Sequence, residues 1–173
     1  MTKRVYLLFG GIWSWDGVAT SAGMNILASK LAALPDVVVK SYSWADYKRC
    51  FADQNTEVKA KDKMIGIGYS GGGPHMTMIA NMMSPYREVM DLMVLYDPSP
   101  PQWMQRIHGN VKRAVCYQNE SPTWFIYPLG AAKLEAASDG PKIEVVPLNM
   151  NHLAVQYDTV LHDKTVEYVR AVR

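Results

Sequence analysis

The stretch Gly66-Ile67-Gly68-Tyr69-Ser70-Gly71-Gly72-Gly73 carries most of the information about the fold. An apolar run that begins at Met64 leads into it, and apolar residues at helical spacing, beginning at Met76, follow it. This order predicts a strand, a sharp turn and a helix, with Ser70 at the centre of the turn.

The turn matches the pattern G-x-S-x-G, which is typical of a nucleophile elbow. A serine held there in an unfavourable backbone conformation brings the residues two before and two after it close together. Gly68 and Gly72 occupy these positions and have no side chain that could clash. Gly71 follows Ser70 directly, so its backbone N–H is a candidate donor to an oxyanion. The pattern therefore nominates Ser70 as a nucleophile.

Two other interpretations fit the same residues. Gly66, Gly68 and Gly71 also spell G-x-G-x-x-G, the pattern of a dinucleotide-binding turn. A glycine-rich turn between a strand and a helix, without any chemistry, is the second. The dinucleotide pattern normally follows the first strand of its domain, whereas this is the third predicted strand. We expect the elbow, and a Rossmann-like nucleotide- or dinucleotide-binding domain remains the alternative.

The composition is that of an ordinary globular domain. The chain has 173 residues, of which 49% are apolar and 20% charged, so we expect a single domain over residues 1–173. A net charge of +2 gives no reason to expect a nucleic-acid partner. No histidine pairs with another ligand at a metal-motif spacing, and no P-loop pattern occurs, so neither a metal nor another cofactor is expected.

The sequence also bears on the compartment. Only Cys50 and Cys116 are present, and the apolar run near the N-terminus is too short for the core of a signal peptide. No apolar stretch approaches the length of a membrane span. We therefore expect a cytoplasmic protein that is not an integral membrane protein. These features do not determine the oligomeric state.

Strand and helix patterns alternate along the whole chain. Strands are predicted at 4–9, 37–42, 63–69, 92–96, 111–117 and 143–148. Helices are predicted at 24–34, 44–52, 74–84 and 161–172, a helical turn at 102–108, a polar surface segment at 53–63 and a loop at 121–141. Several strands are continuous apolar runs, typical of strands that are buried on both faces. These patterns predict an α/β fold with a doubly wound, mainly parallel sheet of about six strands in a three-layer α/β/α sandwich.

Three residues with complementary chemistry follow predicted strands. Ser70, Asp97 and His152 lie at carboxyl ends, which meet at one edge of a parallel sheet. A serine needs a base to take its proton, histidine titrates near neutrality, and a carboxylate can orient the imidazole. Glu120 follows the strand after that of Asp97 and is the alternative acid. We prefer Asp97, because its carboxylate follows its strand directly.

Gly68-Tyr69-Ser70-Gly71-Gly72, followed by Leu95-Tyr96-Asp97-Pro98-Ser99-Pro100, resembles the thioesterase branch of the α/β-hydrolases from about residue 5 to residue 155. The resemblance implies that Ser70 is the nucleophile, Asp97 the acid and His152 the base. It also implies that the loop Gly10-Gly11-Ile12 supplies a second oxyanion N–H, from Gly11 or Ile12, beside that of Gly71.

The chain departs from that branch in size. Two strands must fit between Asp97 and His152, which leaves little for the long lid of such thioesterases beyond 121–141. In size and openness the chain is more similar to cutinases and small phage-encoded esterases. The resemblance therefore implies a serine hydrolase that cleaves an ester or a thioester, with a small-molecule or lipid-like acyl substrate. A non-catalytic, hydrolase-like interaction domain is a further alternative.

The tryptophans add an expectation about substrate binding. Several of the five lie in predicted loops that should border the active site. This placement suggests an apolar surface that binds an acyl group. The alternative, that they are ordinary half-buried tryptophans of loops, fits the sequence equally well. They are Trp13, Trp15, Trp44, Trp103 and Trp124.

Overall fold

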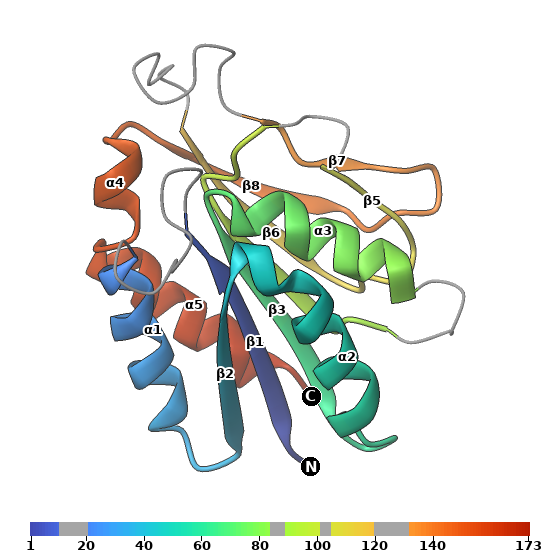
Figure 1. Ribbon diagram of the computed structural model, residues 1–173. Coiled ribbons are helices and arrows are strands. Elements are labelled where there is room, and N and C mark those ends of the chain that lie inside the picture. Colours follow the sequence, from blue (N-terminus) through green and yellow to red (C-terminus); the bar gives the residue numbers. More distant parts are fainter. Residues whose placement is uncertain (11–20, 84–88, 101–104, 120–131) are drawn as a thin grey trace.

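The computed structural model describes residues 1–10, 21–83, 89–100, 105–119 and 132–173. Strands and helices alternate through these ranges (Figure 1). In chain order the elements are β1 (Lys3–Phe9), α1 (Ala22–Ala32), β2 (Val37–Ser43), the 3₁₀ turn η1 (Trp44–Asp46), α2 (Tyr47–Glu57), β3 (Lys63–Tyr69), α3 (Gly72–Met83), β4 (Leu92–Tyr96), β5 (Arg106–Ile107), β6 (Ala114–Asn119), β7 (Glu135–Ala136), β8 (Ile143–Leu148), α4 (His152–Val155) and α5 (Thr159–Ala171).

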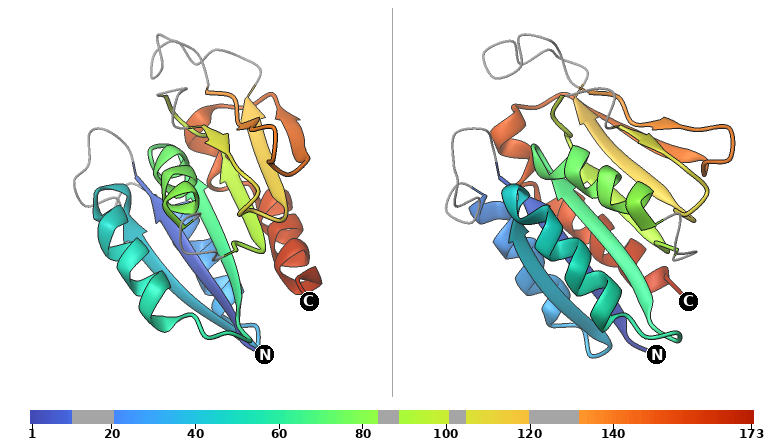
Figure 2. Two further views of the ribbon diagram at one scale, coloured as in Figure 1. Left: turned by 90° about the vertical axis from the view of Figure 1, so that its right-hand side faces the viewer. Right: turned by 45° about the vertical axis from the view of Figure 1, so that its right-hand side comes forward.

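The main sheet has six strands in the order β2-β1-β3-β4-β6-β8, and every neighbouring pair is parallel. Helices α2 and α3 cover one face, and α1 and α5 cover the other (Figures 1 and 2). This arrangement confirms the predicted α/β fold with a doubly wound parallel sheet of about six strands in three layers.

Each face of the sheet carries its own apolar core. Along β1, Val5 and Leu7 pack with residues of α1 and α5, whereas Tyr6 and Leu8 pack with residues of α2 and α3. Successive side chains of a strand point to opposite faces, so a strand covered on both sides must be apolar at nearly every position. This explains why the predicted strands were continuous apolar runs.

The central strands end in register, and this alignment positions the site. Tyr69 at the end of β3 lies opposite Tyr96 at the end of β4, which in turn lies opposite Tyr117 of β6. The residues that follow β3 and β4 are Ser70 and Asp97, so both emerge at one edge of the sheet.

Helix α2 is longer than predicted. The sequence predicts a polar surface segment over 53–63, but the helix continues to Glu57. Asp53 and Glu57 are one helical turn apart and both bind the Lys40 ammonium of β2, which ties this polar end of the helix to the sheet edge.

Three predictions about the second half of the chain are wrong in part. Arg106 and Ile107 form β5 rather than a helical turn, and they pair in parallel with β7, inside the predicted loop 121–141. This two-stranded ribbon lies beside α3 (Figure 1), where Asn81 donates a hydrogen bond to the Arg106 carbonyl oxygen at 2.7 Å. Strand β6 begins at Ala114, three residues later than predicted.

A buried histidine in α5 is expected to make the fold sensitive to acid. His162 is fully buried, its Nε2 lies 2.8 Å from the Gln156 carbonyl oxygen, and its Nδ1 has no partner in the described part of the chain. Burial lowers the pKa of His162, and it also lowers that of His75 in α3. Because a carbonyl oxygen only accepts hydrogen bonds, the neutral form of the His162 imidazole carries its proton on Nε2.

Lowering the pH below about 6.5, the ordinary histidine pKa, is expected to reduce the free energy of unfolding. In that range the unfolded chain binds protons at His162 and His75 that the folded chain does not. Urea unfolding at pH 7.5 and pH 5.5 measures the effect. The variant His162→Gln should lose less stability between the two pH values than the wild-type protein; an equal loss in both would contradict this role of His162.

Candidate active site

The turn between β3 and α3 has the geometry of a nucleophile elbow. Ser70 has a φ angle of 53°, a left-handed conformation that non-glycine residues adopt at a cost. A Cβ atom placed on Gly68 would lie 2.8 Å from the Gly72 carbonyl oxygen. A Cβ atom on Gly72 would lie 1.9 Å from the Leu8 carbonyl oxygen of β1, so neither residue that flanks the serine has room for a side chain, as predicted.

The second strained residue follows the neighbouring strand. Asp97 has a φ angle of 41°, and its N–H donates to the Tyr117 carbonyl oxygen at 2.7 Å. This bond extends the pairing of β4 with β6 by one residue. The Asp97 side chain therefore lies at the edge of the sheet where Ser70 lies.

His152 reaches the same edge from a short helix that the sequence did not predict. It is the first residue of α4, and the side chain of Asn151 caps this helix by accepting the Leu153 N–H at 2.8 Å. The cap determines where the helix begins, and so it determines the place of His152.

Ser70, His152 and Asp97 form one hydrogen-bonded chain. Ser70 Oγ lies 3.0 Å from His152 Nε2, and His152 Nδ1 lies 2.6 Å from Asp97 Oδ2. The exposed fractions of Ser70, His152 and Asp97 are only 5%, 2% and 1%. The structure thus brings together the three side chains that the sequence selected from separate strand ends.

The partners of the imidazole decide which of its nitrogens holds the proton. A carboxylate only accepts hydrogen bonds, so Asp97 favours the tautomer with the proton on Nδ1. Nε2 is then an acceptor for the Ser70 hydroxyl proton. This is the arrangement that a serine nucleophile needs from a general base.

Tyr69 supports the histidine and was not identified from the sequence. Its ring stacks on that of His152, with centroids 5.2 Å apart and planes 18° apart. Its hydroxyl donates to the His152 backbone carbonyl oxygen at 3.1 Å. Only a tertiary contact reveals this role, because Tyr69 and His152 are 83 residues apart in the chain.

Comparisons with solved structures identify the fold. The NocB thioesterase domain from the nocardicin cluster matches 99% of this chain and 94% of its own, with a TM-score of 0.55 and 14% identity. An esterase domain of a Rhodothermus marinus protein matches 98% and 86%, with a TM-score of 0.58 and 8% identity. The peroxisomal alpha-beta-hydrolase Lpx1 of Saccharomyces cerevisiae matches 97% and 77%, with a TM-score of 0.52 and 10% identity.

The chain has the α/β-hydrolase fold. The matches confirm the resemblance noted in the sequence, at the level of the fold. No protein-family model and no curated protein sequence matches the chain. The NocB thioesterase domain has also been solved in covalent complex with a fluorophosphonate nocardicin G analog.

The Gly71 N–H, which was expected to bind the oxyanion, already donates a hydrogen bond within the protein. The Gly71 N–H donates to the Gly10 carbonyl oxygen at 3.1 Å. A substrate oxyanion that used this donor would have to displace the Gly10 oxygen. Gly11 and Ile12, the candidates for the second donor, lie outside the described residues.

Other predicted residues of the site also fall outside the described ranges. They are the alternative acid Glu120 and four of the five tryptophans, Trp13, Trp15, Trp103 and Trp124. The remaining one, Trp44, is half-buried, and its ring lies 5.1 Å from that of His75. A Cβ atom on Gly71 would lie 3.6 Å from Trp44, so this tryptophan borders the turn that carries Ser70.

The dinucleotide-binding interpretation fits the geometry poorly. Gly66 and Gly68 lie inside β3, and a Cβ on Gly66 would meet the sulfur atoms of Met76 and Met90. In a dinucleotide-binding fingerprint the glycines form the turn that approaches the phosphates. Here only Gly71 belongs to the turn.

The described residues offer neither a metal site nor a reactive thiol. No group of three or more His, Cys, Asp or Glu side chains there could hold a metal ion. Burial raises the pKa of both Cys50 and Cys116 to about 12, so these thiols stay protonated at neutral pH and are weak nucleophiles. Within the same ranges, no helix is long and apolar enough to span a bilayer.

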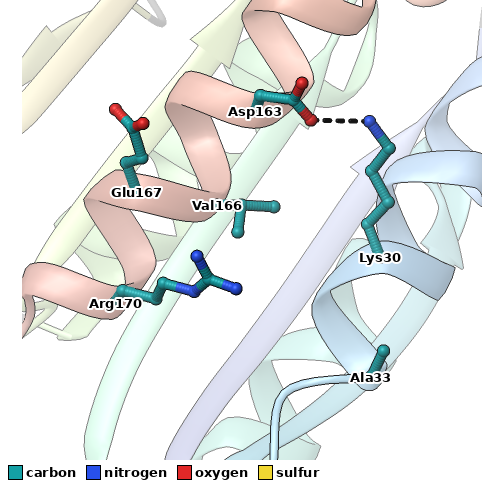
Figure 3. Close-up of a pocket in the computed structure, with 6 residues that line it drawn as sticks. All are labelled: Lys30, Ala33, Asp163, Val166, Glu167 and Arg170. Atoms are coloured by element: carbon teal, nitrogen blue, oxygen red, sulfur yellow. Dashed lines mark hydrogen bonds and ion pairs between the residues drawn. The ribbon is translucent and has the colours of Figure 1, made fainter.

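A hollow between α1 and α5 is separate from this chemistry. Charged side chains dominate its lining, and an ion pair of 2.7 Å between Lys30 and Asp163 crosses it (Figure 3). None of its lining residues belongs to the chain of hydrogen bonds at Ser70. They are Lys30, Ala33, Asp163, Val166, Glu167 and Arg170.

Proposed function

We propose that this protein is a serine hydrolase that cleaves an ester or a thioester through an acyl-enzyme on Ser70. The observation that carries the proposal is the hydrogen-bonded chain from Ser70 Oγ through His152 to Asp97, which starts at an elbow-type turn. The α/β-hydrolase fold, shared with a thioesterase domain and an esterase domain, supports it.

In the proposed reaction Ser70 Oγ attacks the substrate carbonyl carbon while His152 Nε2 takes the hydroxyl proton. The tetrahedral intermediate collapses when the imidazolium gives this proton to the leaving alcohol or thiol. A water molecule then attacks the acyl-enzyme, again with Nε2 as the base, and releases the acid and free Ser70. Asp97 accepts the Nδ1 hydrogen bond throughout and stabilises the imidazolium.

The developing oxyanion is assigned to the Gly71 N–H and to a second N–H from Gly11 or Ile12. Removal of one such donor typically slows an enzyme by about 100- to 1000-fold, so both matter. Since Gly71 donates to the Gly10 oxygen in the free protein, substrate binding must exchange one acceptor for another. The acyl substrate is a small or lipid-like molecule, and the chemistry requires no cofactor.

Labelling with a fluorophosphonate probe tests the proposal directly. The phosphorus mimics the attacked carbonyl carbon, and we expect one adduct per chain, on the peptide that contains Ser70. Peptide mapping by mass spectrometry identifies the site, and protein unfolded in urea is the control that should not react. Folded protein that remains unlabelled would contradict the assignment of Ser70 as a nucleophile.

Labelling, combined with a turnover assay and a binding measurement, separates the alternatives. A non-catalytic interaction domain would give neither adduct nor turnover. A nucleotide-binding domain that uses Gly66, Gly68 and Gly71 would bind a nicotinamide dinucleotide saturably, which isothermal calorimetry would detect. We expect labelling together with ester turnover, and no such binding.

A further inference from the structure

We propose that Asn119 is a positioning residue that holds the Asp97 carboxylate and connects it to the segment that carries His152. The proposal rests on the proposed serine hydrolase. Asn119 is the last residue of β6, the strand next to the one that Asp97 follows. It touches no reacting atom, so it would act through Asp97 and His152.

Asn119 donates to both oxygens of the carboxylate. Its side-chain Nδ2 lies 2.7 Å from Asp97 Oδ2, and its backbone N lies 3.2 Å from Asp97 Oδ1. With His152 Nδ1 on Oδ2, the buried carboxylate accepts three hydrogen bonds from residues that the structure describes. Two donors from one residue fix the rotation of the carboxylate plane, and this rotation decides whether Oδ2 faces the imidazole.

The other end of the same amide reaches the histidine segment. Asn119 Oδ1 accepts the backbone N–H of Met150 at 3.2 Å, two residues before His152. An N–H can donate only to the oxygen of the amide, so this bond orients the amide with Nδ2 toward Asp97. Asn119 is 3% exposed, so water competes little for these bonds.

The conformation of Asp97 shows why such support matters. Its φ angle of 41° is a strained backbone conformation, which persists only where the surroundings over-determine it. A buried carboxylate without donors would also be strongly destabilised in its charged form. Asn119 supplies the donors and, through Met150, sets the distance between acid and base.

A variant that removes the amide at nearly constant volume tests the proposal. For Asn119→Leu we expect kcat on a p-nitrophenyl ester to fall on the order of 100-fold, with little change in KM, because a catalytic group is misplaced while substrate binding is retained. The matched control is Gln54→Leu, a fully buried amide in α2 bonded to Cys50 rather than to the site. Whatever its effect on stability, this variant should leave kcat unchanged.

A second variant gives a pH signature that a purely structural role would not produce. In Asn119→Asp two carboxyl groups lie side by side, and such a pair keeps one proton up to a higher pH than an isolated carboxyl group does. The introduced carboxyl group can replace the lost donor while it is protonated, but once ionised it repels Asp97. The ratio of variant to wild-type kcat/KM should therefore fall as pH rises; a constant or rising ratio would overturn the proposal.

A proton NMR measurement separates failure of this inference from failure of the proposed function. The proton between His152 Nδ1 and Asp97 Oδ2 should give a downfield resonance in the wild-type protein and in Gln54→Leu, and the resonance should broaden or disappear in Asn119→Leu. This readout does not depend on turnover. An unchanged resonance together with an unchanged kcat would overturn the role of Asn119, whereas an inactive wild-type protein whose resonance responds would overturn the hydrolase alone.

Discussion

Replacing Ser70 with alanine is expected to lower ester turnover by about 10⁴- to 10⁶-fold and to abolish fluorophosphonate labelling. The substitution removes only Oγ, the atom that lies 3.0 Å from His152 Nε2 and that would form the acyl bond. Initial rates with a p-nitrophenyl ester, and mass spectrometry after exposure to the probe, measure the two effects.

The control for this substitution is Ser41→Ala. Ser41 is an exposed serine of β2, and its variant should keep wild-type turnover and labelling on the Ser70 peptide. Circular dichroism must show that Ser70→Ala remains folded, because the alanine must also adopt the strained φ angle of 53°. A folded Ser70→Ala protein with full activity would refute the serine mechanism.

The parts of the fold that could be predicted are those in which local pattern and tertiary environment agree. Strands β3, β4 and β8 were predicted at their observed bounds, because each is a short run bounded by turn residues or charges. Their parallel arrangement followed from the intervening helices.

The parts that could not be predicted depend on contacts between distant segments. Strands β5 and β7 have two residues each, too few for any periodic signal, and they exist through their mutual pairing. Helix α4 has four residues and depends on the Asn151 cap. The extension of α2 to Glu57 depends on an ion pair between Glu57 and Lys40 of β2.

The residues of the site also fall into a group that could be predicted from the sequence and a group that could not. The topology of a parallel sheet brings residues that follow its strands to one edge, so Ser70, Asp97 and His152 could be chosen from the sequence. Tyr69 and Asn119 act through side-chain orientation, which no spacing encodes. The sequence shows only that Tyr69 ends the predicted strand 63–69 and that Asn119 lies two residues beyond the predicted strand 111–117.

Asp97→Asn is expected to reduce kcat by about 10⁴-fold with little change in fold. An amide at this position presents either an NH₂ group or a neutral oxygen to His152 Nδ1, so the imidazole loses both the preference for the Nδ1-protonated tautomer and the charge that stabilises the imidazolium. Turnover of a p-nitrophenyl ester across a range of pH, with the melting temperature of each variant, measures the effect.

The matched control is Asp91→Asn, because Asp91 precedes β4 as Asp97 follows it. Asp91 pairs with Lys63 and Lys112 at the opposite end of the strand, at 3.5 and 2.7 Å, so its substitution should lower stability without lowering kcat.

Glu120→Gln, at the alternative position of the acid, should have a mild effect. If Glu120→Gln proved severe and Asp97→Asn mild, the acid would be the residue that follows β6, and the Asp97–His152 hydrogen bond of 2.6 Å would have no catalytic meaning. The three hydrogen bonds that converge on the Asp97 carboxylate, from one imidazole and both donors of Asn119, are the reason to expect the opposite result.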